Sequence, residues 1–344
     1  MSTKPIFDKK NILVVGGAGF IGSHLCDELV REHKVICLDN FITGSEHNID
    51  HLLMNQNFEF VKQDIAESLA LTNKEEGLEK FKVAWQGIQE IYYLASPTAE
   101  GDFQKYPIET LLANSVGLYH ALELAKSNQA KLLFVSSDLI YGKPIDDNWL
   151  MREDRMGIVD PRGSRSQYVE GKRFGEALVT AYNRSYTLDV RIARVFNTYG
   201  PRMKLTDTRM IVEFTRRALN NELITIYGGT AAVGSYCFVT DIVKGLIKLM
   251  DQGDASPVNL GQEQAVAIAD LARQIIELVG SKSQIETKEE MPSYYHRQLL
   301  PDISLAKDKL GWFPITLLQD GLRHTVEFLK ASKGIIDLDE GMDR

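Results

Sequence analysis

Residues 11–22 read NILVVGGAGFIG, and this stretch decides the fold. It opens with a short apolar run, which predicts a buried strand. Glycines follow at regular spacing, and a helical pattern of apolar residues begins among them. In such a turn Gly16 permits the tight bend, Gly19 lets the backbone approach a pyrophosphate, and Gly22 lets the helix pack against the strand. The stretch therefore predicts a dinucleotide site in which the helix N-terminus binds the phosphates.

An acid at the end of the next apolar run indicates which dinucleotide is bound. Asp39 closes the run Lys34–Leu38, about 20 residues after the glycine turn. A carboxylate at this position accepts hydrogen bonds from the ribose hydroxyls of the adenosine and repels a 2′-phosphate. The sequence therefore predicts NAD in preference to NADP. Asp64, which follows the third predicted strand, is expected near the adenine.

Strand and helix patterns alternate along the first 200 residues, an order that is typical of a parallel sheet. The predicted strands cover residues 11–15, 34–38, 58–61, 90–94, 131–136 and 189–195. The main helical patterns cover residues 20–32, 108–126 and 166–184. We therefore expect an α/β fold, a Rossmann-type doubly wound parallel sheet.

The segments become shorter after residue 200, which predicts a smaller C-terminal α/β domain for the substrate. Its expected helices cover 210–220, 241–250, 268–279 and 316–330, and its strands cover 224–227 and 236–239. Residues 73–86 are expected to add a surface helix. The expected division is an NAD-binding domain over 1–200, a mainly substrate-binding domain over 201–332, and an acidic, mobile tail over 333–344.

The composition excludes several classes of function. A net charge of -8 argues against binding to nucleic acid or anionic membranes, because both need clustered basic charge. No stretch reaches the roughly 18 apolar residues of a membrane span, and the first ten residues lack a signal-peptide core. Cys26, Cys37 and Cys237 form no CxxC pair, which favours free thiols in a reducing, cytoplasmic compartment. His47 and His51 lie four residues apart without a third ligand nearby, so no metal site is expected.

A tyrosine and a lysine are placed for acid–base chemistry. In YVEGK, Tyr168 and Lys172 lie four residues apart on one helix face. A phenol has a pKa near 10, and a lysine cation one turn away favours the phenolate, as does a positively charged nicotinamide ring. Tyr168 could then take a hydroxyl proton while hydride leaves the same carbon for NAD. Ser137 follows the fifth strand and is placed to hydrogen-bond the reacting oxygen.

These residues resemble the extended short-chain dehydrogenase/reductase superfamily, which includes the NAD-dependent epimerases and dehydratases. Within it the sequence is most similar to the UDP-glucuronate decarboxylases, over roughly residues 11–329. The matching stretches are GGAGFIGSHLCDEL, DNFITG, YLASPTA, YVEGKRFGE, RIARVFNTYGPRM, ITIYGG and PDISLAKDKLGW. The resemblance implies that NAD oxidises C4 of a sugar, that the resulting β-keto acid loses carbon dioxide, and that NADH then reduces the 4-ketone.

The resemblance also implies roles for individual residues. Ser137, Tyr168 and Lys172 would be catalytic, with Tyr168 and Lys172 also touching the cofactor. Further cofactor contacts are expected from Phe20, Ile21, Asn40, Gly44, Ile65, Leu94, Ala95, Ser96 and Asn114. The nucleotide-sugar or related sugar substrate would be lined by Tyr182, Asn197, Thr198, Arg202 and Arg209. A homodimer is expected through the helices that cover 108–126 and 166–184.

Three positions depart from the decarboxylase pattern. Leu139 stands where the family has the glutamate of its TSEVYG motif, which leaves Asp138 as the acid available for catalysis. Gly234 stands where the family has a diphosphate-binding arginine, and residues 296–300, HRQLL, replace a basic cluster. Either the substrate differs, or other residues take these roles, among them Arg202, Lys204, Arg209 and Arg297.

These departures leave three functions open. The first is a nucleotide-sugar decarboxylase that acts through a 4-keto intermediate. The second is a 4-epimerase, a 4,6-dehydratase or a dehydrogenase for a different sugar. The third is an NAD-binding regulatory protein without turnover, against which the presence of the serine, tyrosine and lysine argues.

Overall fold

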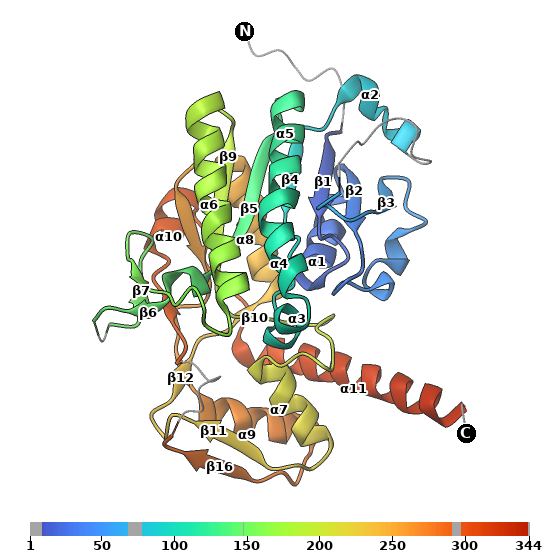
Figure 1. The fold of residues 1–344 in the computed structure, drawn as a ribbon. Coiled ribbons are helices and arrows are strands. Elements are labelled where there is room, and N and C mark those ends of the chain that lie inside the picture. Colours follow the sequence, from blue (N-terminus) through green and yellow to red (C-terminus); the bar gives the residue numbers. More distant parts are fainter. Residues whose placement is uncertain (1–8, 68–77, 147, 291–296, 343–344) are drawn as a thin grey trace.

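The structure is a computed structural model, and it describes residues 9–67, 78–146, 148–290 and 297–342. Its centre is a seven-stranded parallel sheet with the order β14-β9-β5-β4-β1-β2-β3 (Figure 1). The six predicted strands are all present, with ends that differ from the prediction by no more than one residue. They are β1 (Asn11–Val15), β2 (Lys34–Asp39), β3 (Phe58–Lys62), β4 (Glu90–Tyr93), β5 (Lys131–Ser137) and β9 (Val190–Val195). The Rossmann-type fold is therefore confirmed.

The seventh strand comes from the second half of the chain and was not predicted. β14 (Pro257–Leu260) pairs in parallel with β9, with Val258 opposite Ala193. Helix α8 (Val239–Gln252) precedes it and packs on β5 and β9. The chain therefore returns to the sheet after residue 200, although the proposed division into two domains remains a prediction.

Helices cover both faces of the sheet (Figure 1). On one face lie α4 (Pro107–Leu112), α5 (Leu118–Asn128) and α6 (Ser166–Tyr186), and on the other lie α1 (Phe20–Leu29) and α8. The alternation of side chains along β1 supplies both cores, because Ile12 and Val14 pack on the α1 side while Leu13 and Val15 pack on the α5 side. Every one of these four side chains is fully buried.

The helix predicted over 108–126 is interrupted where it passes the site. A π-helical turn, Ala113–Gly117, separates α4 from α5. The Tyr93 hydroxyl donates a hydrogen bond to the Ala113 carbonyl oxygen, and Gly117 lies so close that a Cβ there would be 2.7 Å from Ile65 Cγ2. Such turns are frequent at functional sites, and this one turns the Asn114 side chain toward Ser96.

The C-terminal half adds a lobe that faces the carboxyl ends of the strands (Figure 1). It contains α7 (Met210–Leu219), β11 (Ile224–Tyr227), α9 (Ile268–Val279) and β16 (Ile285–Lys288), and β11 pairs in parallel with β16. The strand expected over 236–239 is only β13 (Cys237–Phe238), because α8 already begins at Val239.

The last helix is longer than predicted. α11 spans Leu318–Met342, so most of the segment expected as a separate tail is helical. Of the surface helix expected over 73–86, residues 73–77 lie outside the described residues. The remainder forms a 3-10 turn, Leu78–Phe81, and the short helix α2 (Val83–Gln86). Within the described part of the chain, no helix combines the length and apolar character that a bilayer crossing requires.

Candidate active site

A cavity of about 800 Å³ lies at the carboxyl ends of the central strands and extends to α7 and β11. Parallel strands end at the same edge of a sheet, so residues far apart in the sequence meet there. The cavity is lined by most residues that the sequence singled out: Gly16, Gly19, Phe20, Ile21, Gly22, Asp39, Asn40, Gly44, Asp64, Ile65, Leu94, Ala95, Ser96, Ser137, Asp138, Tyr168, Lys172, Asn197, Thr198, Arg202 and Arg209.

The glycine turn has no room for side chains. Gly16 has a φ of +81°, and a Cβ there would lie 2.8 Å from the Ala95 amide nitrogen. A Cβ on Gly22 would lie 2.2 Å from the Gly16 carbonyl oxygen. The turn therefore brings bare backbone and the N-terminus of α1 to the cavity wall, the arrangement that a pyrophosphate needs.

The Asp39 carboxylate is fixed at the end of β2. It accepts hydrogen bonds from the amide nitrogens of Ala18 (3.0 Å) and Phe41 (2.8 Å). Burial raises its pKa, and these backbone donors act in the opposite direction. Asn40 next to it donates to the Asp64 carboxylate at 2.9 Å. A buried carboxylate held beside a glycine turn suits ribose hydroxyls and disfavours a 2′-phosphate, so the site fits NAD.

Tyr168 and Lys172 lie one turn apart on α6, and both are buried. Burial raises the pKa of Tyr168 to about 12, although the side-chain hydrogen bond with Ser137 acts to lower this pKa. Burial also lowers the pKa of Lys172 to about 7, and its Nζ donates to the Val135 carbonyl oxygen at 2.8 Å. The ring of Phe103 stacks on Tyr168 at a centroid distance of 5.3 Å. Without a ligand the tyrosine is therefore a neutral phenol that faces the cavity beside a titratable lysine.

Ser137 and Asp138 form a buried pair at the end of β5. The Ser137 hydroxyl donates to Asp138 Oδ1 at 2.9 Å and accepts from the Leu139 amide nitrogen at 3.2 Å. Burial raises the pKa of Asp138 to about 6. The apolar Leu139 side chain follows on the same wall of the cavity. The end of β5 thus offers one carboxyl group, that of Asp138, next to the Ser137 hydroxyl that hydrogen-bonds Tyr168.

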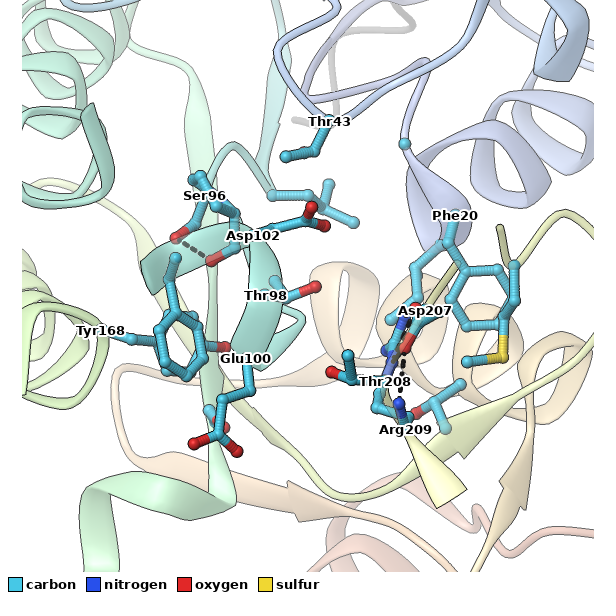
Figure 2. A pocket seen from close by; sticks show the side chains of 18 of the residues that line it. Phe20, Thr43, Ser96, Thr98, Glu100, Asp102, Tyr168, Asp207, Thr208 and Arg209 are labelled. Carbon is cyan, nitrogen blue, oxygen red and sulfur yellow. Dashed lines mark hydrogen bonds and ion pairs between the residues drawn. The ribbon is translucent and has the colours of Figure 1, made fainter. Parts of the chain in front are cut away.

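The wall opposite Tyr168 carries a fixed ion pair (Figure 2). Arg209 Nε donates to Asp207 Oδ1 at 2.9 Å, and the guanidinium lies 5.5 Å from the centroid of the Phe20 ring. Arg202 is also paired, with Asp27 at 2.7 Å. Both predicted substrate arginines therefore reach the cavity, each with its own carboxylate.

Sequence reasoning predicted Leu94, Ala95 and Ser96 directly after β4 (Glu90–Tyr93) but missed residues 98–102, which follow them. Thr98, Glu100 and Asp102 line the cavity on and before α3 (Glu100–Lys105), as Figure 2 shows. Glu100 accepts from Arg165 at 2.6 Å, which ties α3 to the start of α6. The position of this segment directly after a central strand of a Rossmann sheet was the signal that could have identified it.

Two predicted site residues do not line the cavity. Tyr182 lies near the far end of α6, fourteen residues or about 21 Å along the helix from Tyr168. Its hydroxyl donates to Glu123 on α5 at 2.6 Å, so its expected contact with the substrate is wrong. Asn114 lies behind the wall, where its amide donates to the Ser96 hydroxyl at 2.8 Å. It supports a residue of the cofactor side without reaching the cavity itself.

Gly234 stands at the position of the expected arginine, and the side-chain amide of Gln298 occupies the space beside it. A Cβ on this residue of β12 (Val233–Gly234) would lie 2.0 Å from Gln298 Oε1. The Gln298 amide accepts from Asn197 Nδ2 at 3.2 Å and donates to the Tyr236 hydroxyl at 2.9 Å. Asn197, Tyr236 and Gln298 all line the cavity. A neutral network therefore occupies this part of the wall.

The sequence matches the model of the NAD dependent epimerase/dehydratase family over residues 12–261. The chain belongs to this family. UDP-glucuronic acid decarboxylase 1 of Xenopus tropicalis is 39% identical over 324 residues, which cover 94% of this chain and 73% of the relative. UDP-glucuronic acid decarboxylase 3 of Arabidopsis thaliana is 37% identical over 313 residues, covering 90% and 86%.

Solved structures of the same fold contain a UDP-sugar, and one of them also contains NAD. A UDP-glucose 4-epimerase of Thermotoga maritima, solved with UDP-glucose, superposes with a TM-score of 0.79 at 28% identity, covering 94% of this chain and 99% of that chain. A UDP-glucuronic acid 4-epimerase of Bacillus cereus, solved with UDP-glucuronic acid and NAD, has a TM-score of 0.78 at 25% identity and the same coverage. This family member is therefore an NAD-dependent enzyme, and the residues around the glycine turn are those that would hold the cofactor.

Proposed function

We propose that the protein oxidises and then reduces C4 of a nucleotide sugar, and that it decarboxylates UDP-glucuronate or a closely related uronic acid. One observation carries the proposal: Ser137, Tyr168 and Lys172 meet in the cavity that also contains the glycine turn and Asp39. The identity with UDP-glucuronic acid decarboxylases over most of the chain supports the choice of substrate.

The chain's own residues account for the movement of the proton. Ser137 would hold the C4 hydroxyl, and the Tyr168 oxygen would receive its proton. With a pKa raised to about 12, Tyr168 is almost entirely protonated at neutral pH and has no free site for a proton. Nearby positive charge must therefore stabilise its phenolate before it can act as the base. The Lys172 ammonium one turn away favours the phenolate. When bound, NAD supplies the acceptor for the hydrogen and two electrons that leave C4, and it returns them in the last step.

Loss of carbon dioxide follows from the substrate's own chemistry. A ketone at C4 makes the C5 carboxylate that of a β-keto acid, and the electrons of the breaking C–C bond pass into the enolate of that ketone. The Ser137 hydroxyl and the Tyr168 phenol, which now carries the proton, are placed to stabilise the enolate oxygen. Asp138 is the carboxyl group nearest to this pair, and in its protonated form it could return a proton to the sugar.

The experiment is to incubate the NAD-loaded protein with UDP-glucuronate and analyse the nucleotides by mass spectrometry. The proposal predicts a UDP-pentose, lighter by one carbon dioxide. An unchanged mass with inverted C4 would favour a 4-epimerase, and loss of one water would favour a 4,6-dehydratase. Leu139, the apolar residue after Asp138, is the reason to test these alternatives, because the decarboxylases have a glutamate at this position.

We also propose a cytoplasmic homodimer. The free thiols of Cys26, Cys37 and Cys237 are all buried, which suits a reducing compartment. The outer faces of α4 to α6 expose large apolar side chains that a second copy could cover, namely Ile108, Leu111, Val116, Tyr119, Phe174 and Tyr186. Light scattering should give twice the monomer mass, and a Phe174→Glu variant should shift it toward the monomer.

A further inference from the structure

Glu176 continues the face of α6 that carries the catalytic pair. Tyr168, Lys172 and Glu176 are spaced four residues apart, so their side chains follow one another along one side of the helix. The Lys172 ammonium is buried, donates to the Val135 carbonyl oxygen and lies 4.9 Å from the centroid of the Phe134 ring. Burial lowers the pKa of Lys172, and Glu176 is the carboxylate that acts to raise it. The charge that keeps the lysine cationic therefore comes from the next turn of its own helix.

Arg194 of β9 holds this carboxylate in one orientation. Its Nε donates to Glu176 Oε1 at 3.0 Å, and its Nη2 donates to Glu176 Oε2 at 2.8 Å. The two side chains are only 11% and 13% exposed, so water competes little for these bonds. A bidentate pair of this kind fixes both oxygens of the carboxylate. The negative charge of Glu176 is therefore kept in place one turn from Lys172.

The same guanidinium reaches the turn that follows Ser137. Arg194 Nη1 donates to the Tyr141 hydroxyl at 3.0 Å, and the guanidinium carbon lies 4.9 Å from the centroid of the Tyr141 ring. Tyr141 ends the 3-10 turn Asp138–Tyr141, and its own hydroxyl donates to Asn259 Oδ1 of β14 at 2.6 Å. Arg194 thus joins the helix of Tyr168 and Lys172 to the turn that begins at the catalytic serine.

A buried ion pair could also serve the stability of the fold alone. Such a pair is weak evidence for that role, because apolar residues of similar volume often replace it without loss of stability. The two roles differ in their effect on the lysine. A pair that only stabilises the fold leaves the titration of Lys172 unchanged when it is removed, whereas a pair that supports the reaction does not.

We infer that Glu176 and Arg194 are positioning residues: the carboxylate stabilises the Lys172 ammonium, and the guanidinium fixes that carboxylate and joins α6 to the turn after Ser137. This inference rests on the proposed function, in which the ammonium favours the Tyr168 phenolate. Neither Glu176 nor Arg194 is among the residues that line the cavity, so each acts through another residue.

The other elements around Lys172 present few groups that could take over this role. On α6, the Tyr168 ring centroid lies 5.8 Å from Lys172 Nζ. At the end of β5, the Asp138 carboxyl group is engaged by the Ser137 hydroxyl. The π-helical turn contributes the neutral Asn114. Removing the charge of Glu176 should therefore be visible in the titration of the lysine.

The test is an NMR titration of NAD-loaded protein labelled with ¹³C at the lysine Cε atoms. A Lys172→Arg variant identifies the resonance of Lys172. Glu176→Gln should lower the pKa of Lys172 by about one unit relative to wild type, the low end of the range for an opposite charge within about 4–6 Å. Glu170→Gln is the matched control, because it removes the same charge from α6 at a residue that pairs with Arg173 at 3.6 Å. It should leave the pKa of Lys172 unchanged.

The rate of oxidation at C4 gives a second measurement. One pKa unit lost leaves about tenfold less ammonium at a pH above the pKa, so reduced cofactor should form about tenfold more slowly in Glu176→Gln at pH 8. The KM for UDP-glucuronate should not change, because Glu176 does not line the cavity. Glu176→Asp keeps the charge and should restore most of the rate.

The Gln variant leaves Arg194 without its anion, which could prevent folding. The double variant Glu176→Leu, Arg194→Met removes both charges, an exchange that buried pairs often tolerate, and should show the same lowered pKa of Lys172. An unchanged pKa of Lys172 in either folded variant would overturn the inference. Loss of folding in both variants would assign the pair to stability and overturn it as well.

Failure of the proposed function looks different, because the titration needs no substrate. The pKa of Lys172 would then still respond to Glu176, while UDP-glucuronate would remain unconverted.

Discussion

Replacing Asp138 by asparagine tests whether burial at the end of β5 has raised the pKa of this carboxyl group beside Ser137. Its pKa is raised from 3.8 to about 6, chiefly by burial. As the pH rises, the unfolded chain loses this proton first, and the folded protein loses it only near pH 6. The folded protein therefore binds more protons between these values, and the free energy of unfolding falls as the pH rises through this window.

The size of the effect follows from the two pKa values. The difference between 3.8 and about 6 corresponds to about 3 kcal/mol, at about 1.4 kcal/mol for each pKa unit. Asp138→Asn removes this titration. Relative to wild type, the variant should therefore gain up to about 3 kcal/mol of stability between pH 4 and pH 7. Any change in the hydrogen bond to Ser137 adds an offset that does not depend on pH.

Urea unfolding at several pH values measures this difference directly. The matched control is Asp254→Asn, because the hydrogen bond from Lys309 lowers the pKa of Asp254 to about 2. Its stabilising effect is complete above the unfolded pKa and is lost only as the pH falls toward 2, so its curve should run parallel to wild type above about pH 4. If Asp138→Asn also runs parallel to wild type between pH 4 and pH 7, the buried acid has no raised pKa and the reasoning fails.

Two glycines give further predictions, each measured by titration with NAD and with UDP. Gly22→Ala should weaken NAD binding by at least about tenfold, because its Cβ would lie 2.2 Å from the Gly16 carbonyl oxygen. An unchanged affinity for NAD would contradict the role of the glycine turn in binding the pyrophosphate. Gly234→Ala should displace Gln298 and cost about 1–3 kcal/mol of stability through two lost hydrogen bonds, with weaker UDP binding and unchanged NAD affinity. Equal loss of both ligands would point to general unfolding instead.

The sheet was predictable because its strands carry their signal locally. The apolar runs of β1, β2 and β5 are bounded by turns and buried on both faces, as a parallel sheet requires. β14 was missed because its four residues, which begin with Pro257, become a strand only through pairing with β9. The π-helical turn inside the helix predicted over 108–126 likewise depends on a tertiary contact, from the Tyr93 hydroxyl.

The residues of the candidate site also fall into two groups, those that a local sequence pattern predicts and those that only tertiary contacts bring together. The glycine turn, Asp39 and the pair of Tyr168 and Lys172 follow fixed spacings within single elements, so the sequence placed them correctly in one cavity. The Gln298 network is assembled from loop residues, whose positions no spacing determines. Residues 98–102 carried a usable signal, their position shortly after β4, that the sequence reasoning did not use. Tyr182 was misplaced because it shares the catalytic helix but lies about four turns from Tyr168.

Single-turnover mixing of the NAD-loaded protein with UDP-glucuronate tests the central claim most directly. Wild type should form a transient of reduced cofactor, seen by its absorbance, followed by a UDP-pentose lighter by one carbon dioxide. Tyr168→Phe should keep NAD affinity and slow the transient by about 10²–10⁴-fold. A wild type that forms neither reduced cofactor nor product, or a Tyr168→Phe variant that reacts at the wild-type rate, would contradict the account.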